Sequence, residues 1–134
     1  MNEPREPSAG PELTDALGRA CEDLVLRVLR RPDRPTWIQH VRRARASEDR
    51  RGVDVVVQLD VGRVFLQVKR SRWYLARWLA RWGSDPRPIG LVVARETDDE
   101  ADDYGWALGA LILLRERLER EHDARAVPSD EAAW

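Results

Sequence analysis

Lysine is the rarest cation in this sequence: Lys69 stands alone among 23 basic residues, and the other 22 are arginine. Its ammonium is a compact point charge that can hold one water or one oxyanion, whereas arginine presents a flat fork. Lys69 ends an apolar, strand-like run that contains Gln67, and Asp54 opens another apolar run thirteen residues before Gln67. Together, a carboxylate, an amide oxygen and a lysine could bind a divalent metal and cleave a phosphodiester. Alternatively, Lys69 is a solvated cation at a strand end.

The alternation within these two runs predicts which residues share a face of a hairpin. A short loop centred on Val61-Gly62 places Asp54 opposite Lys69 in the neighbouring strand. A slip of one residue would bury Asp54 among the valines, so the pattern predicts that Asp54, Gln67 and Lys69 lie on one face. The other face is then wholly apolar and carries Val53, Val55, Val57, Leu59, Val64, Leu66 and Val68.

Length and composition restrict the class of protein. A chain of 134 residues predicts one domain, and 35% charged with 43% apolar residues is typical of a globular protein. The net charge of −1 provides no global basic field, so any binding of nucleic acid must come from local clusters of arginine. Cys21 is alone, which excludes a disulfide framework and a cysteine zinc site. We see no secretion signal and no apolar run long enough to span a bilayer, and we expect a cytoplasmic protein that does not enter a membrane.

Periodicity predicts an α/β sandwich in the order helix, three strands, helix, strand, helix. Residues 1–11 are expected to form a disordered tail, 12–122 a single domain and 123–134 a second tail. Ser71 is expected to cap the second helix, whose tryptophans have the spacing of core residues. The expected helices cover residues 12–31, 71–82 and 104–122, and the expected strands cover 37–41, 53–59, 63–70 and 89–94.

At this point the chain resembles the PD-(D/E)XK nuclease superfamily. The core of that family is a helix, three antiparallel strands, a helix and a strand. Its site combines an Asp at the start of the second strand with an acid-x-Lys tripeptide on the third, and many members add a Glu from the first helix. Asp54 matches the Asp, Gln67-Val68-Lys69 matches the tripeptide with Gln in place of the acid, and Glu22 matches the helix glutamate. The resemblance covers roughly residues 12–95, although Val53 stands where proline is common.

The resemblance implies a restriction-endonuclease-like fold and an Mg²⁺- or Mn²⁺-dependent endonuclease acting on DNA, with specificity supplied by a homodimer or a partner subunit. Asp54, Gln67, the Val68 carbonyl and Glu22 would hold the metal. Asp54, Gln67, Glu22 and Lys69 would form the catalytic set. The main alternative is a nuclease fold that has lost catalysis and serves nucleic-acid binding or protein assembly, which the neutral Gln67 favours. A plain scaffold domain with a coincidental motif is the third reading.

Two groups of arginines could grip phosphates. Arg42, Arg43 and Arg51 belong to a polar segment, residues 42–51, which could be a strand extension or a solvated loop. Arg70 and Arg72 flank the expected site and are the better candidates. Gln67 has its own alternative, since a buried amide can also satisfy hydrogen bonds within the sheet. Glu22 could likewise be a solvated residue at the edge of its helix.

Overall fold

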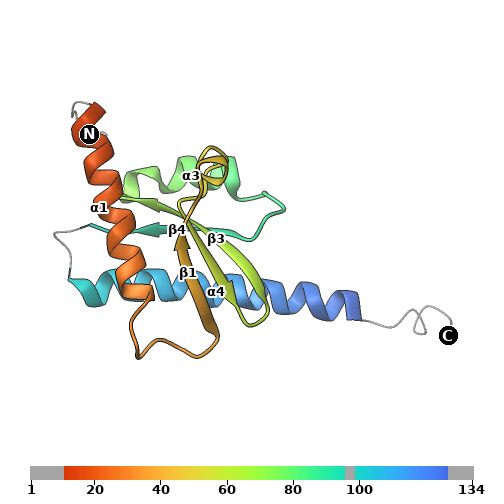
Figure 1. The fold of residues 1–134 in the computed structure, drawn as a ribbon. Coiled ribbons are helices and arrows are strands. Elements are labelled where there is room, and N and C mark those ends of the chain that lie inside the picture. The colour runs from red at the N-terminus through yellow and green to blue at the C-terminus, as the bar shows by residue number, and fades with distance from the viewer. Residues whose placement is uncertain (1–10, 96–98, 127–134) are drawn as a thin grey trace, which may run out of the picture.

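The computed structural model describes residues 11–95 and 99–126 of the chain (Figure 1). It is a mixed α/β structure with one four-stranded sheet, ordered β1-β2-β3-β4, in which β1 to β3 are antiparallel and β4 runs parallel to β3. The predicted α/β class is thus confirmed. The elements are α1 (Pro11–Leu29), β1 (Ile38–Arg43), α2 (Ala46–Asp49), β2 (Val55–Leu59), β3 (Gly62–Lys69), η1 (Arg72–Tyr74), α3 (Leu75–Trp82), β4 (Ile89–Val93) and α4 (Glu100–Ala126).

The two expected tails only partly coincide with the edges of the described structure. Residues 1–10 and 127–134 lie outside the described residues. The first tail was expected to include Pro11, which instead begins α1, and residues 123–126 of the second belong to α4. Within the two described ranges, no helix is both long and apolar enough to cross a bilayer.

The main hydrophobic core lies between one face of the sheet and the helices α1 and α4. Six of the seven residues predicted for the apolar face are buried there: Val55, Val57, Leu59, Val64, Leu66 and Val68. They pack with Val25 and Val28 of α1 and with Ala107 and Leu111 of α4. Val53, the seventh, lies just before β2 and packs on the opposite face. The helices therefore hold the strands rigidly from one side.

The hairpin of β2 and β3 has the predicted faces but a different pairing. Val55 pairs with Leu66 and Leu59 with Gly62, so the turn is at residues 60–61 and the pairing ends at Val55. The predicted pairing is therefore wrong by two residues: Val57 pairs with Val64, whereas a loop centred on Val61-Gly62 would pair it with Leu66. Side chains alternate with a period of two, so this shift leaves the faces of the paired strands unchanged. Asp54 still lies beside β3, because its Oδ2 accepts the Val68 N–H at 2.7 Å.

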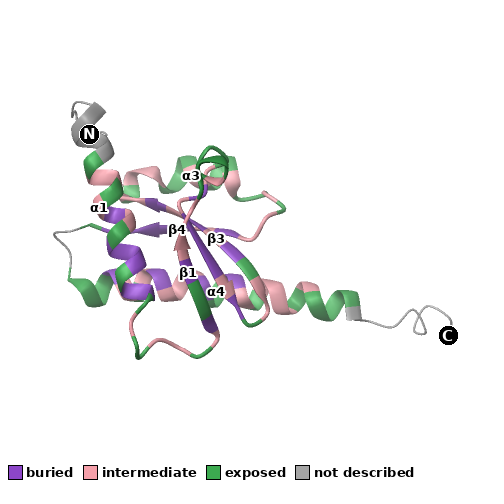
Figure 2. Ribbon diagram, viewed as in Figure 1, coloured by how far each residue is buried: buried purple, intermediate pink, exposed green. Residues whose placement is uncertain are grey.

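A second, smaller cluster lies on the other face of the sheet beneath α3. Its buried members are Val53, Val56 and Ile89, with Trp78 and Trp82 packed against them. Ser71 caps the helical segment as predicted, because its hydroxyl accepts the Trp73 N–H at 3.1 Å. The prediction that the tryptophans of this segment are core residues is wrong in degree: α3 contains no buried residue, as Figure 2 shows.

Gly52 lies directly against the Trp82 ring of α3, and a substitution there tests this packing. Its φ of +85° is in the left-handed region, and a Cβ there would meet Cζ2 of Trp82 at 2.7 Å. We expect Gly52→Ala to lower the free energy of unfolding by roughly 2 kcal/mol, from backbone strain and the displaced indole. Urea denaturation measures this loss. Gly105→Ala is the control: nothing lies within 4 Å of its Cβ position in α4, so stability should rise by ~0.5–1 kcal/mol. Unchanged stability in Gly52→Ala would contradict this packing.

Candidate active site

A cleft of about 410 Å³ opens between α1, the end of β1, α2 and the start of β2. It brings together two of the predicted metal ligands, Glu22 and Asp54, with the predicted phosphate-binding Arg43 and a third carboxylate, that of Asp49. The lining residues are Gly18, Arg19, Glu22, Arg43, Ala44, Ala46, Asp49 and Asp54. Three carboxylates, one from α1, one from α2 and one from the residue before β2, therefore line the same cleft.

Asp54 is placed by the edge of the hairpin. Its backbone N–H donates to the Leu66 carbonyl at 2.9 Å, and its Oδ2 accepts the Val68 N–H at 2.7 Å. The pKa of the Asp54 carboxyl is raised to about 7, chiefly by burial and also by the nearby carboxyls of Glu22 and Asp49, although the hydrogen bond from the Val68 N–H acts in the opposite direction. A carboxyl held in this way is poised to gain from any cation that enters the cleft.

Glu22 projects from α1 into the same cleft. Burial raises the pKa of its carboxyl, and the neighbouring charges of Asp49 and Asp23 act in the same direction. Arg43 opposes them: its Nη1 lies 3.0 Å from Glu22 Oε1, and its Nη2 also pairs with Asp23. Arg43 therefore supplies positive charge to the cleft, but not enough to restore the ordinary pKa of Glu22.

Asp49 is the site residue that sequence reasoning missed. It ends α2, a single turn within the segment expected to be a strand extension or a loop. The turn is held because the Arg45 backbone N–H donates to Glu48 Oε1 at 2.9 Å. The only signal in the sequence was the acidic pair Glu48-Asp49 among arginines, and one turn is too short to show a helical period.

Gln67 and Lys69 lie on β3 and do not line the cleft. The Gln67 Oε1 is buried, and no hydrogen-bond partner is described for it within residues 11–95 and 99–126. The Lys69 ammonium lies 5.0 Å from the centre of the Tyr74 ring, and no ion pair with a carboxylate is found for it in the described part of the chain. The structure therefore groups Glu22 with Asp54 and leaves the amide and the lysine beside them on β3.

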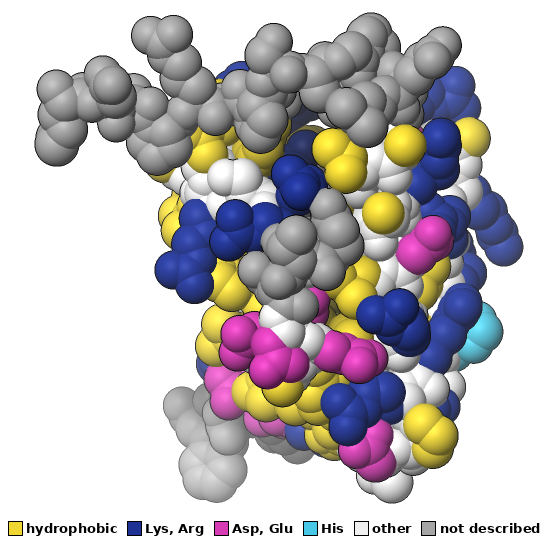
Figure 3. Space-filling view, turned by 90° about the vertical axis from the view of Figure 1, so that its left-hand side faces the viewer, with side chains coloured by type: hydrophobic (Ala, Val, Ile, Leu, Met, Phe, Trp, Pro, Cys, Tyr) yellow, Lys and Arg dark blue, Asp and Glu magenta, His cyan; other side chains and the backbone are white. Residues whose placement is uncertain are grey.

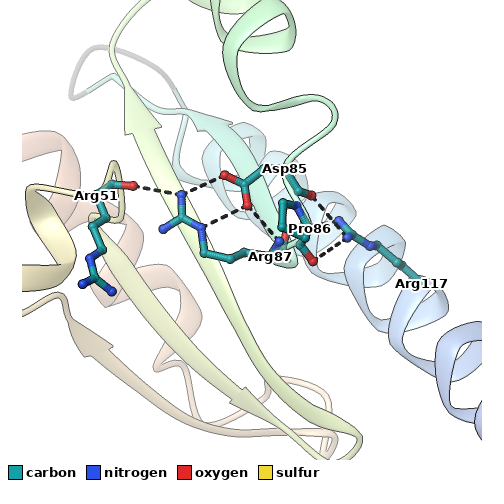
Figure 4. A network of polar contacts seen from close by, with 5 residues as sticks. All are labelled: Arg51, Asp85, Pro86, Arg87 and Arg117. Carbon is teal, nitrogen blue, oxygen red and sulfur yellow. Dashed lines mark hydrogen bonds and ion pairs between the residues drawn. The ribbon is translucent and has the colours of Figure 1, made fainter.

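The arginines predicted to bind nucleic acid divide into two groups. Arg42 forms a double ion pair with Glu48, at 2.7 and 3.0 Å, which lowers the pKa of the Glu48 carboxyl to about 2, and Arg43 pairs with Glu22. Arg72 is exposed and lies 5.0 Å from the centre of the Trp106 ring. Arg51 is exposed too: only its carbonyl enters the network in Figure 4, where it accepts from Arg87 at 3.0 Å. Arg70 is half-buried.

The donors near the cleft suit a cation that prefers oxygen. Among the described residues, no three His, Cys, Asp or Glu side chains are placed to hold a metal ion by themselves. Mg²⁺ commonly binds through one or two carboxylates and keeps several waters, so a smaller carboxylate set is sufficient. On β3, outside the cleft lining, the buried oxygen of Gln67 is a further neutral donor, and no partner is found for it among the described residues. The chemistry of these donors therefore fits Mg²⁺ or Mn²⁺.

A second acidic group lies apart from this cleft. Glu100, Asp102 and Asp103 occupy the first turn of α4, and Figure 3 shows acidic side chains gathered on one part of the surface. Acidic residues favour the amino-terminal end of a helix, which explains their position.

A scan against protein-family models, a search of curated proteins and a search of solved structures find no match to this chain. The function proposed next therefore rests on the cleft and on the strands beside it.

Proposed function

We propose that this protein is an Mg²⁺- or Mn²⁺-dependent endonuclease acting on DNA, built on a PD-(D/E)XK-like core. The observation that carries the proposal is the convergence of Glu22, Asp49 and Asp54 in one cleft, with the pKa of Asp54 raised to about 7. Perturbed carboxyls in a cleft are candidates for catalytic groups. The element order and the parallel pairing of β3 with β4 support a restriction-endonuclease-like fold. For so small a domain, a second copy or a partner subunit would supply sequence specificity.

Each residue of the proposed site has a defined task. Asp54, Glu22, the Gln67 amide oxygen and the Val68 carbonyl would hold the cation, and Asp49 adds negative charge that attracts it. When bound, such a cation polarises a phosphate oxygen and lowers the pKa of water. Lys69 would hold the attacking water or stabilise the charge that develops on the phosphate. At 4 Å from a full negative charge, an ammonium contributes at most ~4 kcal/mol at an effective dielectric constant of 20.

A catalytically inactive module for nucleic-acid binding or protein assembly is the alternative. Gln67 favours it, because a neutral amide attracts a cation less than the acid that it replaces. The placement of the carboxylates, with no three of them set around one point in the described residues, is consistent with it as well. Mn²⁺ calorimetry with wild type, together with nicking of a supercoiled plasmid, separates the two readings: the proposed enzyme binds Mn²⁺ and nicks, and an inactive module does neither.

Gln67→Glu sharpens this test. If the Gln67 oxygen is a ligand, the change adds a negative charge to the site, and the Mn²⁺ affinity measured by calorimetry should rise about tenfold or more. If Gln67 is a structural amide, its replacement buries an unpaired charge and lowers the melting temperature by an amount equivalent to about 1–3 kcal/mol, independently of metal. We expect the first result. Gln58→Glu is the control, because Gln58 lies on β2 outside the cleft and its amide donates to the Leu59 carbonyl.

A further inference from the structure

Residues 69–84 differ in charge from the rest of the chain. This segment contains five basic residues and no acid, although the whole chain carries 24 acids and a net charge of −1. It also holds three of the six tryptophans. The segment follows the end of β3 and forms η1 and α3, and α3 lies on the face of the sheet opposite to α1 and α4 (Figure 1). Positive charge is therefore concentrated in the segment that begins with Lys69.

The arginines of η1 and α3 are not neutralised by acids. In the described parts of the chain, no ion pair with a carboxylate is found for Arg72, Arg77 or Arg81. Each lies over an indole ring instead, with the guanidinium carbon 5.0, 5.2 and 4.7 Å from the centres of the rings of Trp106, Trp73 and Trp82. An arginine stacked on a ring keeps its charge and its outward N–H donors. These arginines therefore remain able to contact anions.

The outer surface of α3 is poorly packed and partly apolar. Leu75 and Leu79 are 39% and 53% exposed, and no residue of the helix is buried. Trp78 and Trp82 fasten the helix to the small cluster beneath it. Trp73 belongs to neither hydrophobic cluster and is half-buried, and the ring of Tyr74 is perpendicular to its ring with the centroids 5.0 Å apart. Its indole is therefore not explained by core packing.

The segment after α3 is held firmly in place. Arg87 forms a double contact with Asp85, at 3.0 Å to each carboxylate oxygen, and it also donates to the Arg51 carbonyl and stacks over Trp82. Arg117 of α4 donates to the carbonyls of Pro86 and Arg87 at 2.9 and 3.2 Å (Figure 4). The network therefore holds the loop that follows α3 against α4 and Arg51.

We propose that the flank of η1 and α3 formed by Trp73, Arg77 and Arg81, which follow one another at a spacing of four residues, binds a single-stranded stretch of nucleic acid. The arginines contact successive phosphates, and Trp73 provides a ring on which an unpaired base stacks. Interleaved cations and aromatic rings are the pattern that single-strand binding uses, because every base has a face that can stack. A duplex would occupy the arginines but leave the indole without a base. The inference depends on the proposed function for its nucleic-acid substrate, and it adds the form of that substrate.

Fluorescence anisotropy with fluorescein-labelled dT20 in EDTA tests this binding without cleavage. Arg77→Gln with Arg81→Gln should weaken binding at least tenfold at 50 mM salt, and the slope of log affinity against log salt should become shallower by roughly 1.4. Trp73→Ala should weaken binding about 5- to 100-fold with the slope unchanged, and Trp73→Phe should restore most of it. Arg120→Gln with Arg125→Gln removes the same charge from exposed positions on α4 and should leave binding near wild type.

Three results would overturn the proposal. The first is that a 20-base-pair duplex binds as tightly as dT20. The second is that the two double arginine variants weaken binding equally. The third is that the protein binds anionic phosphatidylglycerol vesicles but does not bind dT20. Circular dichroism of Trp73→Ala establishes that a loss of binding is not a loss of fold. Failure here is distinct from failure of the nuclease: Mn²⁺-dependent nicking with no dT20 binding would remove only this inference. Binding of dT20 with no nicking would remove only the enzyme.

Discussion

Asp54→Asn is expected to abolish Mn²⁺-dependent nicking of DNA and, at the same time, to stabilise the metal-free protein at pH 8. The first effect follows from the loss of the central carboxylate of the cleft, which Glu22 and Asp49 cannot replace from their own elements. We expect nicking to fall by at least 10³-fold and Mn²⁺ binding to disappear from the calorimetric trace. Asn keeps an oxygen that can accept the Val68 N–H, so the hairpin should remain intact.

The gain in stability follows from the raised pKa of the Asp54 carboxyl, about 7 against an ordinary value of 3.8. Between these two pH values the folded state holds a proton that the unfolded state releases, so the stability of wild type falls as the pH rises from 4 to 7. Above pH 7 the loss is complete and amounts to at most ~4 kcal/mol. Asn carries no charge and avoids this loss. The variant should therefore be more stable than wild type at pH 8 and similar to it at pH 4.

Urea denaturation in EDTA at pH 4, 6 and 8 measures this difference. Asp60→Asn is the matched control, because Asp60 pairs with Arg115 and the pKa of its carboxyl is lowered instead of raised. That variant should show no gain at pH 8 and should bind Mn²⁺ as wild type does. If the difference in free energy of unfolding between Asp54→Asn and wild type does not depend on pH, then folding does not raise the pKa of the Asp54 carboxyl. Retained nicking would remove it from the catalytic set.

Lys69→Arg is expected to lose DNA cleavage by about 10²–10³-fold, the usual effect of removing one charge-stabilising donor from an active site. Arginine keeps the positive charge, and it can also stack on Tyr74, where the Lys69 ammonium lies now. Its flat guanidinium cannot take the place of a compact ammonium that holds one water. Melting temperature and Mn²⁺ affinity should therefore stay near wild type while the chemical step fails.

Single-turnover cleavage of supercoiled plasmid with Mn²⁺ measures this effect on the chemical step alone. Arg63→Lys provides the reverse exchange at an exposed position on the same strand, and its rate should equal that of wild type. A fully active Lys69→Arg protein would show that only charge is needed at this position. The role assigned to a compact ammonium would then be withdrawn.

The sequence was a good guide to the faces of the sheet and a poorer guide to pairing. Alternation depends only on neighbours in the chain, and it correctly placed Val55, Leu66 and their equivalents on the buried face. The turn was expected at Val61-Gly62, whereas Gly62 is the first residue of β3. Several short loops are compatible with the same alternation, because moving the turn by one residue changes the pairing by two and leaves the faces alone.

The candidate site was predictable only where strand geometry determines it. Asp54 and Gln67 could be grouped because they lie in neighbouring strands with a common period. The cleft also needs α1 to bring Glu22 over the end of β1 and α2 to turn Asp49 inward. These are tertiary arrangements without a local pattern. Helical spacing likewise identified an apolar stripe on α3, but it could not show that the sheet leaves every residue of this helix at least partly exposed.

The unequal size of the two hydrophobic clusters has a consequence for how the molecule moves. The larger cluster joins the sheet to α1 and α4, whereas the smaller one has three buried residues beneath α3. Local opening follows the amount of apolar surface that must be exposed, so the α3 side separates from the sheet at a lower free energy than global unfolding. We therefore expect a more stable half that carries the acidic cleft and a less stable half that carries the arginines of α3. Substrate that engages α3 would have to order this less stable half before it reached the carboxylates.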